Sequence, residues 1–214
     1  IALAFDSRKR MYVVEMKDYS EQEKESLGQV RLLTDSNHDG IYNQSVIFAD
    51  SLSWPTAIIC FDDGVFVGAA PDIFFLKDTD GDGKADIRKK VFSGFGRNNV
   101  QGLLNSFRWG LDNRIHGATS SSGGTVYRFK DNPKTGIQLR GRDFSVDPRT
   151  LQIQSETGGA QHGMCFDDWG NKYVCSNSDH AQLVLYDDHY LSRNPTMSAI
   201  RPRISIADDG GQAP

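Results

Sequence analysis

A short pattern that recurs four times constrains the fold of this chain more than any other feature. Each copy has a small residue, an apolar residue and an aspartate, followed by a turn and a strand-forming segment. Successive copies lie about 50 residues apart, a spacing typical of β-propeller blades. The copies are Ala4-Phe5-Asp6, Cys60-Phe61-Asp62, Gly110-Leu111-Asp112 and Cys165-Phe166-Asp167.

Further strand candidates follow each copy and complete a four-stranded unit. Apolar, β-branched and aromatic runs bounded by turn residues predict strands. The third-strand candidates are residues 28–33, 73–76, 124–129 and 182–186, and the fourth-strand candidates are 46–49, 89–92 and the pair 142–146 and 151–154. The sequence therefore predicts an all-β chain, a β-propeller of four-stranded antiparallel blades, with about four blades of six present. The predicted blades are 1–54, 55–104, 105–160 and 161–214.

Composition excludes several classes of protein. The formal net charge is −4, whereas a nucleic-acid-binding surface usually needs a basic footprint. No apolar run approaches the roughly 20 residues that a transmembrane helix needs. Nucleic acid is therefore not an expected partner, and no transmembrane segment is predicted.

The three cysteines occupy positions where the other copies carry small residues. Cys60 and Cys165 align with Ala4 and Gly110, while Cys175 aligns with glycines in the second strands of two other copies. This alignment predicts buried free thiols packed between blades. A Cys165–Cys175 disulfide is the alternative.

The segment from Asp78 to Asp86 carries the most specific motif. Asp78, Asp80, Asp82 and Asp86 stand at positions 1, 3, 5 and 9 of the motif, and Lys84 at position 7 can supply a backbone carbonyl. Alternating oxygen donors with this spacing converge on calcium. The flanking residues predict strands rather than helices, so we expect a calcium loop within a β-hairpin.

A second, less acidic copy of this motif lies in the preceding blade. Its candidate ligands are Asp35, Asn37, Asp39, the carbonyl of Ile41, and Asn43. Fewer carboxylates predict weaker calcium binding. Both loops join a third to a fourth strand, so we expect structural calcium at the rim; a solvated acidic turn without an ion is the alternative.

Polar residues gather in other loops, which a propeller brings to one end of its central channel. Ligand sites prefer such mouths. His162 is the candidate base because the pKa of an unperturbed histidine lies near neutral pH. The candidate cofactor-binding residues are Arg108, Gln161, Asn177 and His180.

Arg108 is expected to hold a carboxylate, and Gln161 or Asn177 to orient a polar substrate. The alternative is that these side chains only satisfy loop backbone groups, as polar loop residues commonly do. His116, inside a second strand, and His189, in a late turn, are expected to be structural.

Several motifs taken together resemble a known family. They are Leu76 to Asp86, Gly94-Phe95-Gly96, Gln101-Gly102-Leu103, Arg108-Trp109-Gly110, residues 140–144, Gln161-His162-Gly163, residues 166–171 and residues 174–178. This combination is similar to the membrane-bound dehydrogenase family of planctomycete and verrucomicrobial bacteria. The resemblance implies a periplasmic, extracellular or membrane-associated propeller related to the soluble quinoprotein glucose and sorbosone dehydrogenases.

The resemblance also implies a haem-domain redox partner, and since this chain holds no CxxCH motif, another domain would supply the haem. The leading functional expectation is an oxidoreductase acting on a small-molecule or carbohydrate substrate, such as a sugar or alcohol. Pyrroloquinoline quinone is the expected organic cofactor. Two alternatives stay open: a non-catalytic carbohydrate- or protein-binding propeller, and a calcium-dependent lactonase-type hydrolase with Glu15 and Asn177 as metal ligands.

Overall fold

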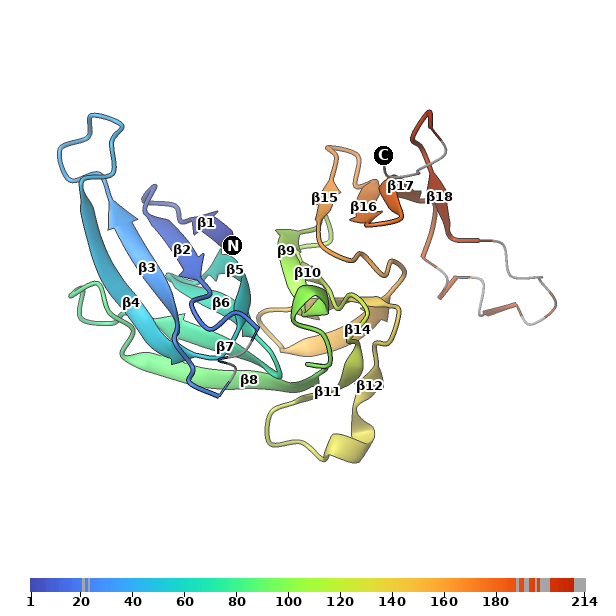
Figure 1. The fold of residues 1–214 in the computed structure, drawn as a ribbon, viewed down its shortest axis with the longest axis horizontal. Helices are drawn as coiled ribbons and strands as arrows, with labels where there is room; N and C mark the ends of the chain where they lie inside the picture. Colours follow the sequence, from blue (N-terminus) through green and yellow to red (C-terminus); the bar gives the residue numbers. More distant parts are fainter. Residues whose placement is uncertain are drawn as a thin grey trace. The chain divides into compact units, whose positions relative to one another are not determined.

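The computed structural model describes residues 1–20, 22, 24–187, 189–190, 193–194, 196 and 201–209. The chain is all-β, with strands that form four-stranded antiparallel sheets (Figure 1). It divides into two compact units, Ile1–Gly94 and Phe95–Pro214. At least four strands lie inside each of the four predicted blade ranges, and the first strand of each range ends within or just before the recurrent small-apolar-aspartate pattern.

The first unit contains two sheets whose strands pair in chain order. The first sheet is β1 (Ala2–Phe5), β2 (Met11–Glu15), β3 (Gly28–Thr34) and β4 (Gln44–Leu52). The second is β5 (Pro55–Phe61), β6 (Gly64–Ala69), β7 (Asp72–Lys77) and β8 (Ile87–Phe95). In both sheets the third and fourth strands flank an Asp-rich loop.

One apolar core joins these two sheets. Tyr12 and Phe48 of the first sheet meet edge to face, with ring centroids 5.0 Å apart. Val65 and Val67 of β6 are fully buried in the same cluster. Every residue of β6 is buried. The uninterrupted apolar character of this segment therefore reflects a strand covered on both faces.

The second unit contains the other two sheets. The third sheet is β9 (Asn105–Trp109), β10 (Ile115–Ala118), β13 (Asp143–Asp147) and β14 (Gln152–Glu156). The fourth is β15 (Met164–Phe166), β16 (Lys172–Ser176), β17 (Asp179–Val184) and β18 (Arg203–Ser205). β18 has no counterpart among the strands predicted from sequence.

The expectation that residues 124–129 form the third strand of the third blade is wrong. β13 pairs with β10 in that place, whereas β11 (Gly124–Arg128) pairs with β12 (Ile137–Gln138). Ser120, Gly123 and Gly124 all have positive φ, which turns the chain away after β10. The hydroxyl of Thr119 donates to the carbonyl oxygens of Leu139 and Arg142. These bonds bring the chain back beside the end of β10 just before β13 begins.

Helical structure among the described elements consists of two short 3₁₀ turns, η1 (Val100–Gly102) and η2 (Pro133–Thr135). Within the part of the chain that the structure describes, no helix has the length and apolarity to cross a membrane. The candidate functional side chains are therefore expected mainly on the loops between strands, as in propeller-type blades.

The cysteine expectation is only partly met. All three thiols are free, so Cys165 and Cys175 are not joined. Cys60 and Cys175 are half-buried, but Cys165 is exposed. Cys165 alternates along β15 with the buried Met164, so its side chain lies on the solvent face of that short strand.

Candidate functional site

The loop between β7 and β8 is built around the carboxylate of Asp78. The backbone N–H of Gly81 donates to Oδ1 at 2.7 Å, and that of Gly83 donates to Oδ2 at 2.9 Å. Both glycines have positive φ, a conformation that side-chain-bearing residues adopt at a cost. The glycines therefore allow the loop to curl around its first aspartate.

Three carboxylates converge inside this loop. Ligand oxygens of Asp78, Asp80 and Asp86 lie within 4.8 Å of one another. The backbone N–H and hydroxyl of Thr79 both donate to Asp86 and lower the pKa of its carboxyl group. A cluster of ionised oxygens at this spacing suits a hard divalent cation.

Asp82, the fourth predicted carboxylate, lies outside this trio. Its Oδ1 accepts the backbone N–H of Lys84 at 2.8 Å. The side chain thus supports the turn that precedes Asp86. The structure therefore brings together three of the four acidic ligands predicted from sequence.

The loop between β3 and β4 repeats the same scaffold. The N–H of Gly40 donates to Asp35 at 2.8 Å, as that of Gly83 does to Asp78. The N–H of Ile41 donates to Asp39 at 2.8 Å, as that of Lys84 does to Asp82. The two loops are thus structural copies and not only sequence copies.

In this second loop, the side-chain amides of Asn37 and Asn43 donate to oxygens that could otherwise bind a cation. Asn43 Nδ2 donates to Asn37 Oδ1 at 3.1 Å, and Asn37 Nδ2 donates to Asp39 Oδ2 at 3.0 Å. The loop carries two carboxylates where the other carries four. Lower charge and internal amide bonds both reduce its attraction for a cation.

The predicted polar site of the fourth blade is partly assembled. The Oε1 atom of Gln161 accepts the backbone N–H of Asn177 at 2.9 Å, and the Gln161 N–H donates to the Cys175 carbonyl at 3.0 Å. Asn105, at the start of β9, donates to the Gln161 carbonyl at 3.0 Å. These contacts gather the loops before β9 and β15 with the loop after β16, as expected from the order of strands.

The two histidines beside this junction are both exposed. The backbone carbonyl of His162 accepts from the Cys175 thiol at 3.1 Å, which fixes its backbone and leaves its imidazole in solvent. His180 lies in β17 rather than in a loop, with Nε2 3.9 Å from Asp209. His162 is thus placed beside Gln161, while His180 faces the end of the described chain.

The expectation that Arg108 belongs to this site is wrong. Arg108 lies inside β9 opposite His116, near the turn that leads into β10. Asn105, which contacts Gln161, stands at the other end of the same strand. The guanidinium of Arg108 donates to the Phe107 carbonyl at 2.8 Å. β9 runs through Trp109, so Arg108 lies within the strand rather than in the loop before it.

Glu15, the candidate lactonase ligand, is surrounded by donors. Its carboxylate accepts from Gln29 at 2.5 Å and pairs with Arg31 at 3.0 Å and Lys17 at 3.3 Å. Neighbouring cations compete with a metal ion for these oxygens. Glu15 also belongs to the first unit, whereas Asn177 belongs to the second.

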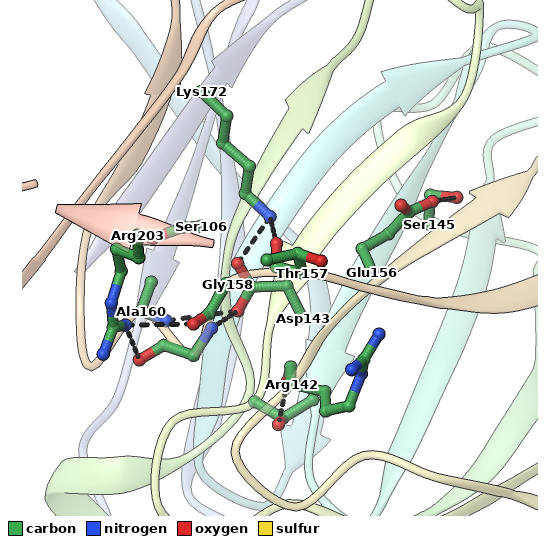
Figure 2. A network of polar contacts seen from close by, with 12 residues as sticks. Ser106, Arg142, Asp143, Ser145, Glu156, Thr157, Gly158, Ala160, Lys172 and Arg203 are labelled. Carbon is green, nitrogen blue, oxygen red and sulfur yellow. Dashed lines mark hydrogen bonds and ion pairs between the residues drawn. The ribbon is translucent and has the colours of Figure 1, made fainter. Parts of the chain in front are cut away.

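A buried ion pair that sequence reasoning missed positions the chain just before Gln161. Lys172 lies 2.5 Å from Asp143, whose side chain is fully buried. Asp143 accepts the N–H groups of Gly159 and Ala160 at 2.9 and 3.2 Å. Figure 2 shows these groups converging, with the Arg203 guanidinium reaching the backbone near Gly158. No local motif marks a pair separated by this much sequence.

The same fold recurs in a solved protein. The crystal structure of a protein from Lactobacillus plantarum, a structural genomics target, aligns with a TM-score of 0.54 and 13% identity over 97% of this chain. The chain spans 56% of that protein's length, so the likeness supports the fold alone. No curated protein matches the chain. A family model described as a domain of unknown function, DUF7133, matches residues 1–214, and the chain therefore belongs to that family.

Proposed function

We propose that this chain is part of an extracytoplasmic β-propeller in which both Asp-rich hairpins bind calcium as a structural ion. The observation that carries the proposal is the convergence of Asp78, Asp80 and Asp86 in the β7–β8 hairpin. Lys84 would add its backbone carbonyl. The second loop, which begins at Asp35, shares the scaffold with fewer charges and would bind more weakly.

Location follows from the expected affinity. Calcium sites of low rigidity or low ligand charge fill best at the millimolar calcium concentrations found outside the cytoplasm. Both hairpins join the third and fourth strands of their own sheets, whereas Gln161 precedes the first strand of its sheet and Asn177 follows the second. Calcium would therefore stabilise the blades without touching a substrate.

Calorimetric titration of the whole chain with calcium chloride tests this proposal. We expect Asp80→Asn to weaken the tighter binding event by about tenfold, near 1.4 kcal/mol, because one of three converging charges is lost. Asp131→Asn, an exposed turn aspartate outside both loops, is the matched control and should leave binding unchanged. Wild-type protein that binds no calcium at millimolar concentration would contradict the proposal.

We further propose that the complete propeller is an oxidoreductase acting on sugars or alcohols. The support is the junction of Gln161 with Asn177 and the adjacent exposed imidazole of His162, together with the family resemblance. In this role His162 would take the hydroxyl proton of the substrate and Asn177 would orient it, while the hydride would pass to an organic two-electron acceptor held by residues other than these. A haem domain is the proposed redox partner.

The residues predicted to hold pyrroloquinoline quinone do not fit that cofactor. The quinone carries three carboxylates, and Arg108, the permanently cationic member of the predicted set, stands at the other end of β9. The side-chain oxygen of Gln161 is already used by the backbone of Asn177. No step through a quinone is therefore assigned to these residues.

Dye-linked oxidation of an aldose and alcohol panel by full-length protein tests the catalytic proposal. His162→Ala should abolish dye reduction, and Lys134→Ala is the control because Lys134 is exposed and lies outside both the Gln161–Asn177 junction and the pocket lining. If His162→Ala keeps full activity, the imidazole is not the base. Glycan binding without turnover that survives loss of both His162 and His180 would support the binding-module alternative.

A further inference from the structure

A pocket between the third and fourth sheets lies within the second unit. Its volume is about 640 Å³, within the range of small-molecule sites. The third sheet contributes β10, β14 and the turn at residues 110–114; the fourth contributes the turn at 166–172 and residues 184–190. No residue that the sequence nominated as catalytic, cofactor-binding or metal-ligating lines it.

The rim of this pocket carries exposed apolar side chains. Trp169 is 84% exposed, Leu111 68%, Tyr190 61% and Leu185 47%. Scattered exposed apolar residues are ordinary, but four around one hollow form a patch that indicates a ligand. Leu111 and Gly170 lie close together, because a Cβ at Gly170 would stand 3.2 Å from Leu111. The two turns therefore form a continuous edge.

The Trp169 turn is held rigidly. The Asp167 carboxylate accepts the N–H of Trp169 at 3.0 Å and that of Asn171 at 2.8 Å. A turn whose backbone is fixed in this way reduces the ordering cost when a ligand binds to the indole.

His116 stands in the wall of the pocket with one ring nitrogen buried and, within the described chain, unpaired. His116 is 8% exposed, and its Nε2 lies 3.1 Å from the Asp112 carboxylate. Burial lowers the pKa of His116, so the ring is neutral. Because a carboxylate only accepts, Nε2 carries the proton and Nδ1 has a bare lone pair. Nδ1 is buried without a hydrogen-bond partner among the described residues.

Both acidic and basic side chains line the pocket, and its two cations already have partners: Arg114 donates to Ser145 and Gln152, and Lys172 pairs with Asp143. Asp187 accepts from the Thr157 hydroxyl at 3.1 Å and pairs with the His189 imidazole at 3.0 Å. Glu156 lies beside Asp187 and accepts from Ser145 at 2.6 Å. Each carboxylate oxygen can accept more than one hydrogen bond, so hydroxyl donors on a ligand can add to these internal bonds.

We propose that this pocket binds a neutral carbohydrate, as a short oligosaccharide or the end of a polysaccharide chain. The sugar places its apolar C–H face on Trp169 and directs hydroxyl groups to Asp112 and Asp187. This site is separate from the Gln161–Asn177 junction, so it goes beyond the proposed oxidoreductase. It holds the ligand without transforming it.

Tryptophan fluorescence and calorimetric titration of the whole chain with cellohexaose, xylohexaose, mannohexaose and maltohexaose test the proposal. We expect at least one to bind, and Trp169→Ala to weaken it by about tenfold or more, as loss of an aromatic anchor does. Trp109→Ala is the matched control, because Trp109 is 42% exposed and lies outside the pocket lining; its affinity should stay within about twofold.

Leu111→Ala gives a second test at an exposed rim position, with circular dichroism to confirm folding of each variant. His162→Ala should bind the hexasaccharide as wild type does, which separates this site from the proposed catalytic one. The proposal is overturned if no hexasaccharide binds at millimolar concentration. It is equally overturned if both rim variants bind as wild type does, or if only polygalacturonate or an apolar peptide binds.

Discussion

Glu156 is a buried acid that lies beside a second carboxyl group, Asp187. Burial, with Asp187 beside it, raises the pKa of Glu156 to about 7, while hydrogen bonds from Glu156 and His189 lower that of Asp187. The pair therefore shares one proton between two carboxyl groups at mildly acidic pH. The favourable state has Glu156 protonated and donating to Asp187.

This proton makes the stability of the fold depend on pH. The native state keeps the Glu156 proton between pH 4.5, its ordinary pKa, and about 7, whereas the unfolded chain releases it. Its contribution to the free energy of unfolding is therefore complete below pH 4.5 and is lost as pH rises towards 7. We expect a loss of roughly 3 kcal/mol from this group.

Urea unfolding at pH 4.5, 6 and 7.5 checks this expectation. Glu156→Gln keeps a neutral donor beside Asp187, so its free energy of unfolding should fall less over this range than that of wild type. Glu25→Gln, at an exposed turn, should follow the wild-type curve. Identical slopes for Glu156→Gln and wild type would show that Glu156 titrates normally.

Burial also makes the thiols of Cys60 and Cys165 differ in reactivity. Burial raises the pKa of Cys60 to about 12, so its nucleophilic thiolate is scarce at pH 8. Cys165 is exposed. Iodoacetamide followed by peptide mass spectrometry should modify Cys165 well before Cys60. Equal rates for the two cysteines in folded protein would contradict the burial of Cys60.

At the level of elements, the buried pair of Asp143 and Lys172 joins β13 of the third sheet to β16 of the fourth. Lys172 also donates to the Thr157 carbonyl at 2.9 Å. The chain between them approaches so closely that a Cβ at Gly158 would stand 1.7 Å from the Asp143 carboxylate. Only glycine therefore fits at position 158 against the buried Asp143–Lys172 pair.

Breaking this pair from one side should be costly. Lys172→Met leaves the Asp143 charge buried, and we expect a loss of about 3–5 kcal/mol in the free energy of unfolding. Asp143→Asn combined with Lys172→Met removes both charges and keeps an oxygen for Gly159 and Ala160. The double variant should be more stable than Lys172→Met alone, and Lys134→Met, at an exposed position, should match wild type.

The elements also show what the sequence can and cannot predict. The first and second strands of each blade follow the small-apolar-aspartate pattern, because that pattern encodes a local turn between two alternating strands. β11 was misassigned because its apolar pattern fits any sheet, and only the positive φ of Ser120 and Gly123 directs it away from β10.

The sites divide in the same way. Both Asp-rich loops were predictable, since all their ligands lie within nine consecutive residues. The Asp143–Lys172 pair and the His116 pocket depend on how two sheets pack, which no local spacing records. The position of Arg108 could not be predicted, because it depends on where β9 ends. That end places Arg108 near the turn into β10, and its residue type does not indicate this.

For the whole molecule, the division into two units separates the proposed calcium sites from the other candidate sites. Both Asp-rich loops belong to Ile1–Gly94, whereas the Gln161–Asn177 junction and the inter-sheet pocket belong to Phe95–Pro214. Calcium should therefore stabilise the first unit locally. Activity and carbohydrate binding should depend on the second.

Hydrogen–deuterium exchange of the whole chain with and without millimolar calcium tests this central claim most directly. We predict that calcium slows exchange in residues 28–52 and 72–95, around the two loops, and leaves residues 161–184 unchanged. Asp80→Asn should remove the effect at 72–95 and keep that at 28–52. Slower exchange confined to residues 161–184, or none around either loop in protein that binds calcium, would contradict a structural role for the Asp-rich hairpins.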